Sequence, residues 1–121
     1  MNNTSLGKRG EDIAEKFLQD RGFKILDRNF QNKFGEIDLV AVDEDTLVFV
    51  EVKTRYSDKF GKPEEAVTPR KVRKIIKAGQ YYRNFKKDLD LPELERIDVV
   101  ALGLKADGEI KRIELIENVT G

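Results

Sequence analysis

Residues 36–53 read EIDLVAVDEDTLVFVEVK, two apolar runs joined by an acidic turn at Glu44-Asp45. Both runs are rich in β-branched and aromatic residues, which favour strands, so we expect strands over 36–42 and 46–54. Successive side chains on a strand point to opposite faces. Both faces of each run are apolar, a pattern typical of a sheet that is covered on both sides or of central strands.

The turn also predicts how the two strands pair. If Glu44-Asp45 is a two-residue turn, residues whose numbers sum to 89 lie opposite each other, which places Asp38 across from Glu51 and Glu36 across from Lys53. Two opposed carboxylates destabilise a sheet unless a proton or a cation lies between them. Carboxylate oxygens suit a hard divalent ion, Mg²⁺ or Mn²⁺, and Lys53 would add a positive charge beside it. The alternative is an ordinary ion pair between Glu51 and Lys53, with Asp38 only ending a strand.

The rest of the chain predicts one αβββαβ(β) unit. Thr68 and Pro69 are typical of a helix start, a capping hydroxyl followed by proline at the first helical position. The other expected elements are a helix over 6–21, a strand over 23–30, a turn over 32–35, a loop over 57–66, a helix from 68 to about 87, and strands over 96–104 and 109–116. In the second helix we expect Val72, Ile75, Ile76, Gly79 and Tyr82 to face inward.

Length and composition exclude several classes. A chain of 121 residues fits one domain. It contains no Cys and no His, which excludes thiolate chemistry and a histidine base at neutral pH. The longest strictly apolar runs have four residues, so we expect no membrane span and a cytoplasmic protein.

Charge is balanced overall but segregated along the chain. Residues 53–87 carry twelve bases and three acids, although the net charge of the whole chain is zero. A basic surface beside an acidic pocket suits binding of a polyanion with a metal. The alternative is two solvated faces of opposite sign. In the second helix, Arg70, Arg73, Lys74 and Lys77 are expected opposite Val72 and Ile76, with Tyr81 on the same side as the bases.

The first helix contributes a further acid. At 100° per residue, Glu11 lies about 20° from Leu18, on the rim of the apolar arc. If that arc packs on the sheet, Glu11 can reach the carboxylate pair, and the small residues Gly7 and Gly10 would allow close approach. The alternative is a solvated glutamate at the helix edge.

Several blocks of sequence occur in a fixed order. Asp38 is followed thirteen residues later by Glu51-Val52-Lys53. The other blocks are Gly7 to Glu11, Gly35 to Val40, Phe49 to Arg55, and Phe60-Gly61 with Pro63, Glu65, Ala66 and Val67. The first pattern resembles the PD-(D/E)XK motif of the restriction-endonuclease-like superfamily, with Ile37 in place of proline. The whole set resembles the bacterial YraN-like family, which is similar to archaeal Holliday-junction resolvases, although residues 113–121 lack the histidine and terminal aromatic pattern of many relatives.

The resemblance implies an α/β, restriction-endonuclease-like αβββαβ core with a mixed central sheet flanked by helices. It implies that Asp38 and Glu51 bind a metal, that Lys53 assists catalysis and that Glu11 joins the metal shell, with Glu36 and Gln80 as supporting residues. A carboxylate-held ion would activate water for phosphodiester hydrolysis without histidine. The residues expected to hold the nucleic acid are Arg55, Lys59, Lys62, Arg70, Arg73, Lys74, Lys77 and Tyr81, the last by stacking on a base.

The expected function is therefore that of a metal-dependent nuclease acting on DNA, including branched DNA such as a four-way junction. A non-catalytic nucleic-acid-binding domain that keeps the fold is the alternative, and a partner-binding adaptor is a third. Opposed carboxylates favour the nuclease, because a domain that only binds has no need for them. Cutting a junction takes two active sites, so that activity requires a symmetric homodimer.

Overall fold

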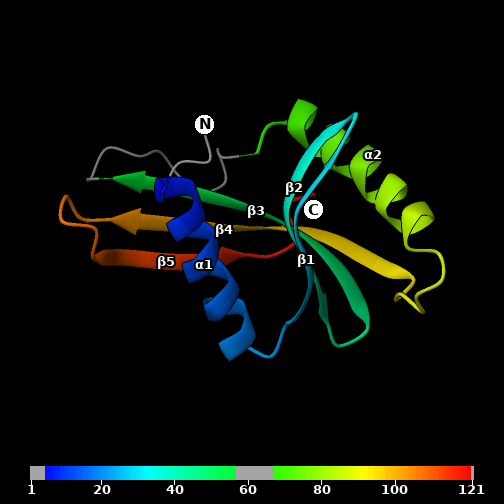
Figure 1. Cartoon of the computed structure of the whole chain (residues 1–121), viewed down its shortest axis with the longest axis horizontal. Helices are drawn as coiled ribbons and strands as arrows, with labels where there is room; N and C mark the ends of the chain where they lie inside the picture. Colours follow the sequence, from blue (N-terminus) through cyan, green and yellow to red (C-terminus); the bar gives the residue numbers. More distant parts are fainter. Residues whose placement is uncertain (1–4, 57–66, 121) are drawn as a thin grey trace.

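A computed structural model of the chain describes residues 5–56 and 67–120, and the expected loop over 57–66 lies outside them. The elements follow the predicted order, and each boundary lies within two residues of its expected position (Figure 1). They are α1 (Ser5–Asp20), β1 (Lys24–Asn32), β2 (Gly35–Asp43), β3 (Thr46–Tyr56), α2 (Pro69–Phe85), β4 (Leu94–Leu104) and β5 (Ile110–Ile116).

The five strands form one mixed sheet in the order β1-β2-β3-β4-β5. β3 and β4 run parallel, whereas the other neighbours run antiparallel. A parallel pair cannot be closed by a tight turn and needs a crossover connection. The segment that holds α2 supplies it, which places this helix over the sheet.

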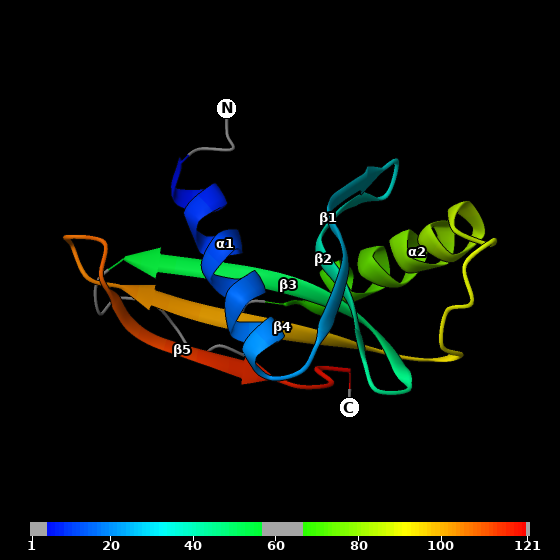
Figure 2. The same ribbon diagram turned by 60° about the horizontal axis from the view of Figure 1, so that its bottom comes forward.

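The two helices cover opposite faces, as the apolar faces of β2 and β3 predicted. Ala14 and Leu18 of α1 pack on a core that includes Leu39 and Val48. Residues of α2 pack on a second core that includes Phe49. Figure 2 shows α1 lying across β3 and β4, with α2 beside β1 and β2 at the other end of the sheet.

The start of α2 confirms the predicted capping pattern. The backbone N–H of Lys71 donates to Oγ1 of Thr68 at 3.2 Å, and Pro69 occupies the first helical position. The buried residues of the inward face are Ile75, Ala78, Gly79 and Tyr82, at the spacing of one helical stripe, and Val72 is partly buried against the same core. The prediction that Ile76 faces inward is wrong: Ile76 lies 100° around the helix from Ile75, and it is 38% exposed.

Gly79 is required by close packing on the second core. A Cβ built at this position would lie 2.5 Å from Cε2 of Phe49. Real side chains do not approach so closely, so glycine lets the helix lie directly on the aromatic ring.

An aromatic seam joins the β1–β2 hairpin to α2. The ring of Phe30 in β1 lies with its centroid 6.2 Å from that of Tyr81, 5.0 Å from Tyr82 and 5.9 Å from Phe85. Edge-on and tilted pairs at these distances are favourable. The seam therefore fixes the position of the hairpin relative to the helix.

The sheet forks between β2 and β3. Their ladder confirms the predicted register and runs as far as the pair Leu39 and Val50. Beyond that pair β2 stays with β1, where Glu36 pairs with Gln31, while β3 stays with β4 (Figure 2). The prediction that Glu36 faces Lys53 is wrong, because the two residues lie on different prongs of the fork.

A buried charged network ties β4 to its surroundings. Asp98 is fully buried and accepts hydrogen bonds from Nε of Arg96 at 3.0 Å and from the backbone N–H of Asn118 at 2.8 Å. Arg96 also pairs with Asp43 at 2.8 Å. Burial raises the pKa of Asp98, whereas the hydrogen bonds from Arg96 and Asn118 act against that rise.

Both helices are short and amphipathic, with 16 residues in α1 and 17 in α2. Over residues 5–56 and 67–120, neither helix has the length and apolar character needed to cross a membrane.

Candidate active site

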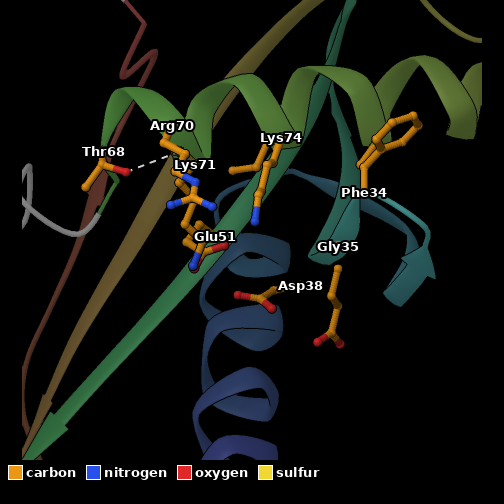
Figure 3. A pocket seen from close by; sticks show the side chains of 11 residues that line it. Phe34, Gly35, Asp38, Glu51, Thr68, Arg70, Lys71 and Lys74 are labelled. Carbon is orange, nitrogen blue, oxygen red and sulfur yellow. Dashed lines mark hydrogen bonds and ion pairs between the residues drawn. The ribbon is translucent and has the colours of Figure 1, made fainter.

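A cleft of about 560 Å³ opens at the fork of the sheet. Acidic side chains from the strands face basic side chains from the first turns of α2, and Figure 3 shows Lys71 and Lys74 reaching from the helix toward Glu51 and Asp38. The lining residues are Phe34, Gly35, Glu36, Asp38, Glu51, Thr68, Arg70, Lys71, Lys74, Ile75 and Ala78.

Asp38 and Glu51 both line this cleft, although not as a backbone-paired couple. The ladder between their strands ends one position earlier, at Leu39 and Val50. Instead, Oδ2 of Asp38 accepts a hydrogen bond from the backbone N–H of Val52 at 2.8 Å. The side chain of Asp38 thus bridges the two prongs of the fork, at the point where the strands separate.

The electrostatic environment of Asp38 is unusual for a carboxylate. Burial, the negative charge of Glu51 and weaker contributions from Glu11 and Glu36 raise the pKa of Asp38 to about 7, against the opposing hydrogen bond from Val52. Deprotonating Asp38 therefore puts a costly charge into the cleft at neutral pH. A bound cation would relieve that cost.

Three carboxylates form a cluster whose oxygens are close enough to one another to share a metal ion. One carboxylate oxygen each of Glu11, Glu36 and Asp38 lies within 4.8 Å of the other two. The structure therefore brings Glu11 to the carboxylates, as the position of this residue on the rim of the α1 arc indicated. A Cβ at Gly10 would overlap Oγ1 of Thr54, so the neighbouring glycine allows α1 to approach β3. A donor set made only of carboxylate oxygens suits Mg²⁺ or Mn²⁺.

Asn29 holds two of these acids, and sequence reasoning missed it. Its Nδ2 donates to Oε2 of Glu11 at 2.9 Å and to Oε2 of Glu36 at 2.7 Å. The backbone of Asn29 is left-handed, with φ of 54°, a conformation that asparagine adopts more readily than most residues. The sequence signal that could have identified Asn29 is its residue type, because asparagine is uncommon inside a predicted strand.

Arg28 anchors the first-helix acids from the outside. Its Nε lies 3.5 Å from Oε1 of Glu11, and its Nη1 lies 2.7 Å from Asp12 and 3.3 Å from Glu15. One guanidinium therefore links three acids of α1 to β1. This link keeps Glu11 turned toward the strands.

Glu51 is paired with a lysine that the sequence pattern did not single out. Nζ of Lys71 lies 2.6 Å from Oε2 of Glu51. The side chain of Glu51 is 7% exposed, whereas that of Lys71 is 42% exposed. Lys71 precedes the buried Ile75 by four residues and so shares its helix face, which was the signal that could have identified it.

Lys53 lies two residues beyond Glu51 on β3 and is half-buried. Burial lowers the pKa of Lys53, and the positive charges of Arg55 and Lys71 act in the same direction. Glu51 and Asp38 oppose that change. The charge of Lys53 is therefore coupled electrostatically to both carboxylates.

The predicted nucleic-acid-binding residues divide into three groups. Arg70 and Lys74 line the cleft. The second group, Arg55, Arg73, Lys77 and Tyr81, is exposed, and Nζ of Lys77 lies 5.9 Å from the ring centroid of Phe34. Gln80, which the resemblance implies as a supporting residue, is exposed as well. Lys59 and Lys62 lie outside the described residues. Of the two apolar residues expected opposite these bases, Val72 is partly buried against the second core, whereas Ile76 is exposed.

The fold and the cleft together define a small mixed α/β protein with a carboxylate cluster facing a basic helix. The chain belongs to the uncharacterised protein family UPF0102, whose sequence profile matches residues 10–102, and this confirms the predicted YraN-like family. The match spans Glu11, Asn29, Asp38, Glu51 and Lys71.

Curated relatives in the same family align over most of this chain. A UPF0102 protein of Syntrophus aciditrophicus (strain SB) is 47% identical over 116 residues, which cover 96% of this chain and 88% of the relative. One from Syntrophomonas wolfei is 48% identical over 109 residues, covering 90% and 92% of the two chains. One from Caldicellulosiruptor saccharolyticus is 42% identical over 118 residues, covering 98% of each.

Proposed function

We propose that this protein is a metal-dependent nuclease that hydrolyses phosphodiester bonds in DNA, on a core of the restriction-endonuclease-like type. One observation carries the proposal: a cluster of carboxylates and a row of cations face each other across a single cleft. A divalent ion would bind on the acidic side, and the phosphate backbone would lie along the basic side. Both halves of a metal–phosphate complex thus find their counter-charges in one place.

The donor chemistry supports a hard divalent ion. Asp38, Glu11 and Glu36 offer oxygen ligands within a short distance of one another, and Glu51 adds a fourth carboxylate on the same cleft. The pKa of Asp38 is raised by burial and by the charges of the neighbouring acids, and a bound cation would offset both effects. When bound, Mg²⁺ or Mn²⁺ lowers the pKa of a coordinated water and screens the phosphate.

The residues of the chain then take distinct roles. Asp38 and Glu51 would hold the ion, and Glu11 and Glu36 would complete its surroundings. Lys53 keeps a positive charge beside the two acids, where it either orients the attacking water or neutralises charge that develops on the phosphate.

Phosphate contacts outside the reacting position come from α2. Arg70 and Lys74 lie in the cleft and would bind the backbone of the nucleic acid without reading its sequence. The exposed Arg73, Lys77 and Tyr81 continue along the same helix, the last as a stacking platform for an unpaired base. Such contacts favour a substrate recognised by shape, such as a branched junction.

Cleavage assays test the proposal directly. Purified protein is incubated with single-stranded, duplex, flap and four-way-junction DNA in the presence of Mg²⁺ or Mn²⁺. We expect cleavage that Asp38→Asn and Lys53→Ala abolish and that the exposed-site controls Asp88→Asn and Lys87→Ala leave unchanged. Cleavage that persists in both active-site variants would reject the assignment. DNA binding without cleavage under either metal would favour a non-catalytic nucleic-acid-binding domain.

A further inference from the structure

The ion pair between Lys71 and Glu51 joins the two walls of the cleft. Its length of 2.6 Å makes it a short, charge-assisted contact. Glu51 is buried, and a buried carboxylate without a partner is strongly destabilising. Lys71 therefore neutralises the carboxylate that the proposed function assigns to the metal.

We propose that Lys71 is a displaceable cation: it neutralises Glu51 until a divalent ion binds, and it then turns to a phosphate of the bound nucleic acid. The inference rests on the proposed function, and it adds a regulatory step at the same site. It assigns to Lys71 a role in ordering the events, metal first and phosphate second.

The chemistry of the side chain suits such an exchange. Lysine carries a compact charge on a flexible stem of four carbons, and this side chain is 42% exposed, so the ammonium group can leave Glu51 without disturbing the core. Arg28 offers a contrast within the same site. Its rigid guanidinium contacts three acids at once, which is the arrangement of a permanent anchor.

The surroundings favour release once another cation arrives. A divalent ion brings two charges and can bind several carboxylates, whereas Lys71 pairs with one acid, Glu51, among residues 5–56 and 67–120. After release, the ammonium group stays on the wall of the cleft that Arg70 and Lys74 already line.

The exchange predicts opposite effects of one substitution on two ligands. Lys71→Met removes the competing charge while keeping much of the apolar stem. We expect Mn²⁺ to bind about fivefold to tenfold more tightly to this variant than to the unaltered protein. DNA affinity should fall, and its dependence on salt should weaken by about one phosphate contact.

Two further variants separate the exchange from a general loss of positive charge. Lys74→Met removes a charge one turn away on the same wall, so it should weaken DNA binding with little effect on Mn²⁺ affinity. Lys71→Arg should bind Mn²⁺ more weakly than the unaltered protein, because a guanidinium can hold the carboxylate with two hydrogen bonds. Mn²⁺ binding is measured by electron paramagnetic resonance and DNA binding by fluorescence anisotropy, with thermal unfolding to verify that each variant folds.

The outcomes distinguish the exchange from the function on which it rests. If the unaltered protein binds Mn²⁺ and cleaves DNA but Lys71→Met binds Mn²⁺ no more tightly, the exchange is refuted and the nuclease assignment stands. If neither protein binds Mn²⁺ at millimolar concentration, both are refuted. Equal tightening of Mn²⁺ binding in Lys71→Met and Lys74→Met would reduce the effect to general electrostatics and would also overturn the exchange.

Discussion

Replacing Asp38 with asparagine should stabilise the protein, and by an amount that depends on pH. Asparagine has nearly the same shape, and its side-chain oxygen can still accept the hydrogen bond from Val52. It carries no charge, so it avoids the cost that burial and the charge of Glu51 impose on the deprotonated Asp38. The variant should therefore be more stable under any condition in which Asp38 is ionised.

The sign of the pH dependence follows from the raised pKa. Between an ordinary value of 3.8 and a folded-state value of about 7, the folded protein retains a proton that the unfolded chain has lost. The free energy of unfolding of the unaltered protein consequently falls as the pH rises through this interval. The advantage of Asp38→Asn should be small near pH 4, grow across the interval and reach its full size above about pH 7.

The magnitude can be bounded from the same interval. A separation from 3.8 to about 7 corresponds to at most about 4 kcal/mol. Solvent in the cleft screens part of the interaction, so we expect a gain of about 2 kcal/mol at about pH 8. Added Mg²⁺ should reduce the difference, because an ion that binds only the folded, unaltered protein stabilises that protein alone.

Urea denaturation at about pH 4 and about pH 8, with and without Mg²⁺, measures all of these quantities. Asp88→Asn is the matched control, since it removes the same charge from an exposed turn and should change stability by less than about 0.5 kcal/mol. If Asp38→Asn is no more stable than the unaltered protein at about pH 8, or gains the same amount at both pH values, the electrostatic account of the cleft is wrong.

Three further substitutions test other parts of the structure. Gly79→Ala should lower the free energy of unfolding by about 1–3 kcal/mol, because a Cβ there meets the ring of Phe49; a more stable variant in urea denaturation would contradict this. Asn29→Gly keeps the left-handed backbone but removes both hydrogen bonds to the acids, so Mn²⁺ affinity should fall about tenfold to a hundredfold, whereas Asn118→Gly should leave it unchanged. An equal effect of the two asparagine substitutions on Mn²⁺ affinity would count against the role of Asn29. Arg96→Met strands a buried carboxylate of β4 and should cost about 3–5 kcal/mol in the same denaturation assay, and a loss below about 1 kcal/mol would show that the buried pair is not needed.

The order of the elements and the pairing of β2 with β3 were predictable because both depend on nearby residues. Apolar periodicity marked the strands, and the turn at Glu44-Asp45 set the register that the ladder confirms. The cluster of acids was accessible in part, since Asp38 follows from the strand pattern and Glu11 from its angle on a helix, but its third member is Glu36 in place of the expected Glu51. These inferences needed only local geometry.

What the sequence could not predict depends on contacts between distant segments. The fork at Leu39 and Val50 arises where β2 follows β1 and β3 follows β4, a choice that no single hairpin determines. The pairing of Lys71 with Glu51 depends on where α2 lies over β3, and the exposure of Ile76 depends on the rotation of that helix about its axis. The hydrogen bonds from Asn29 to Glu11 and Glu36 require a left-handed backbone at this position in β1. The neighbouring residues in the sequence do not predict that conformation.

The aromatic seam has a mechanical consequence for the cleft. Prising the hairpin from α2 would separate the ring of Phe30 from three partners, each worth about 0.5–1.5 kcal/mol, so the total is several times the thermal energy. The aromatic contacts thereby hold the β1–β2 hairpin and α2 at a fixed separation. We expect the cleft to admit a polymer only if the thickness of that polymer fits, because neither the hairpin nor α2 can shift far to accommodate it.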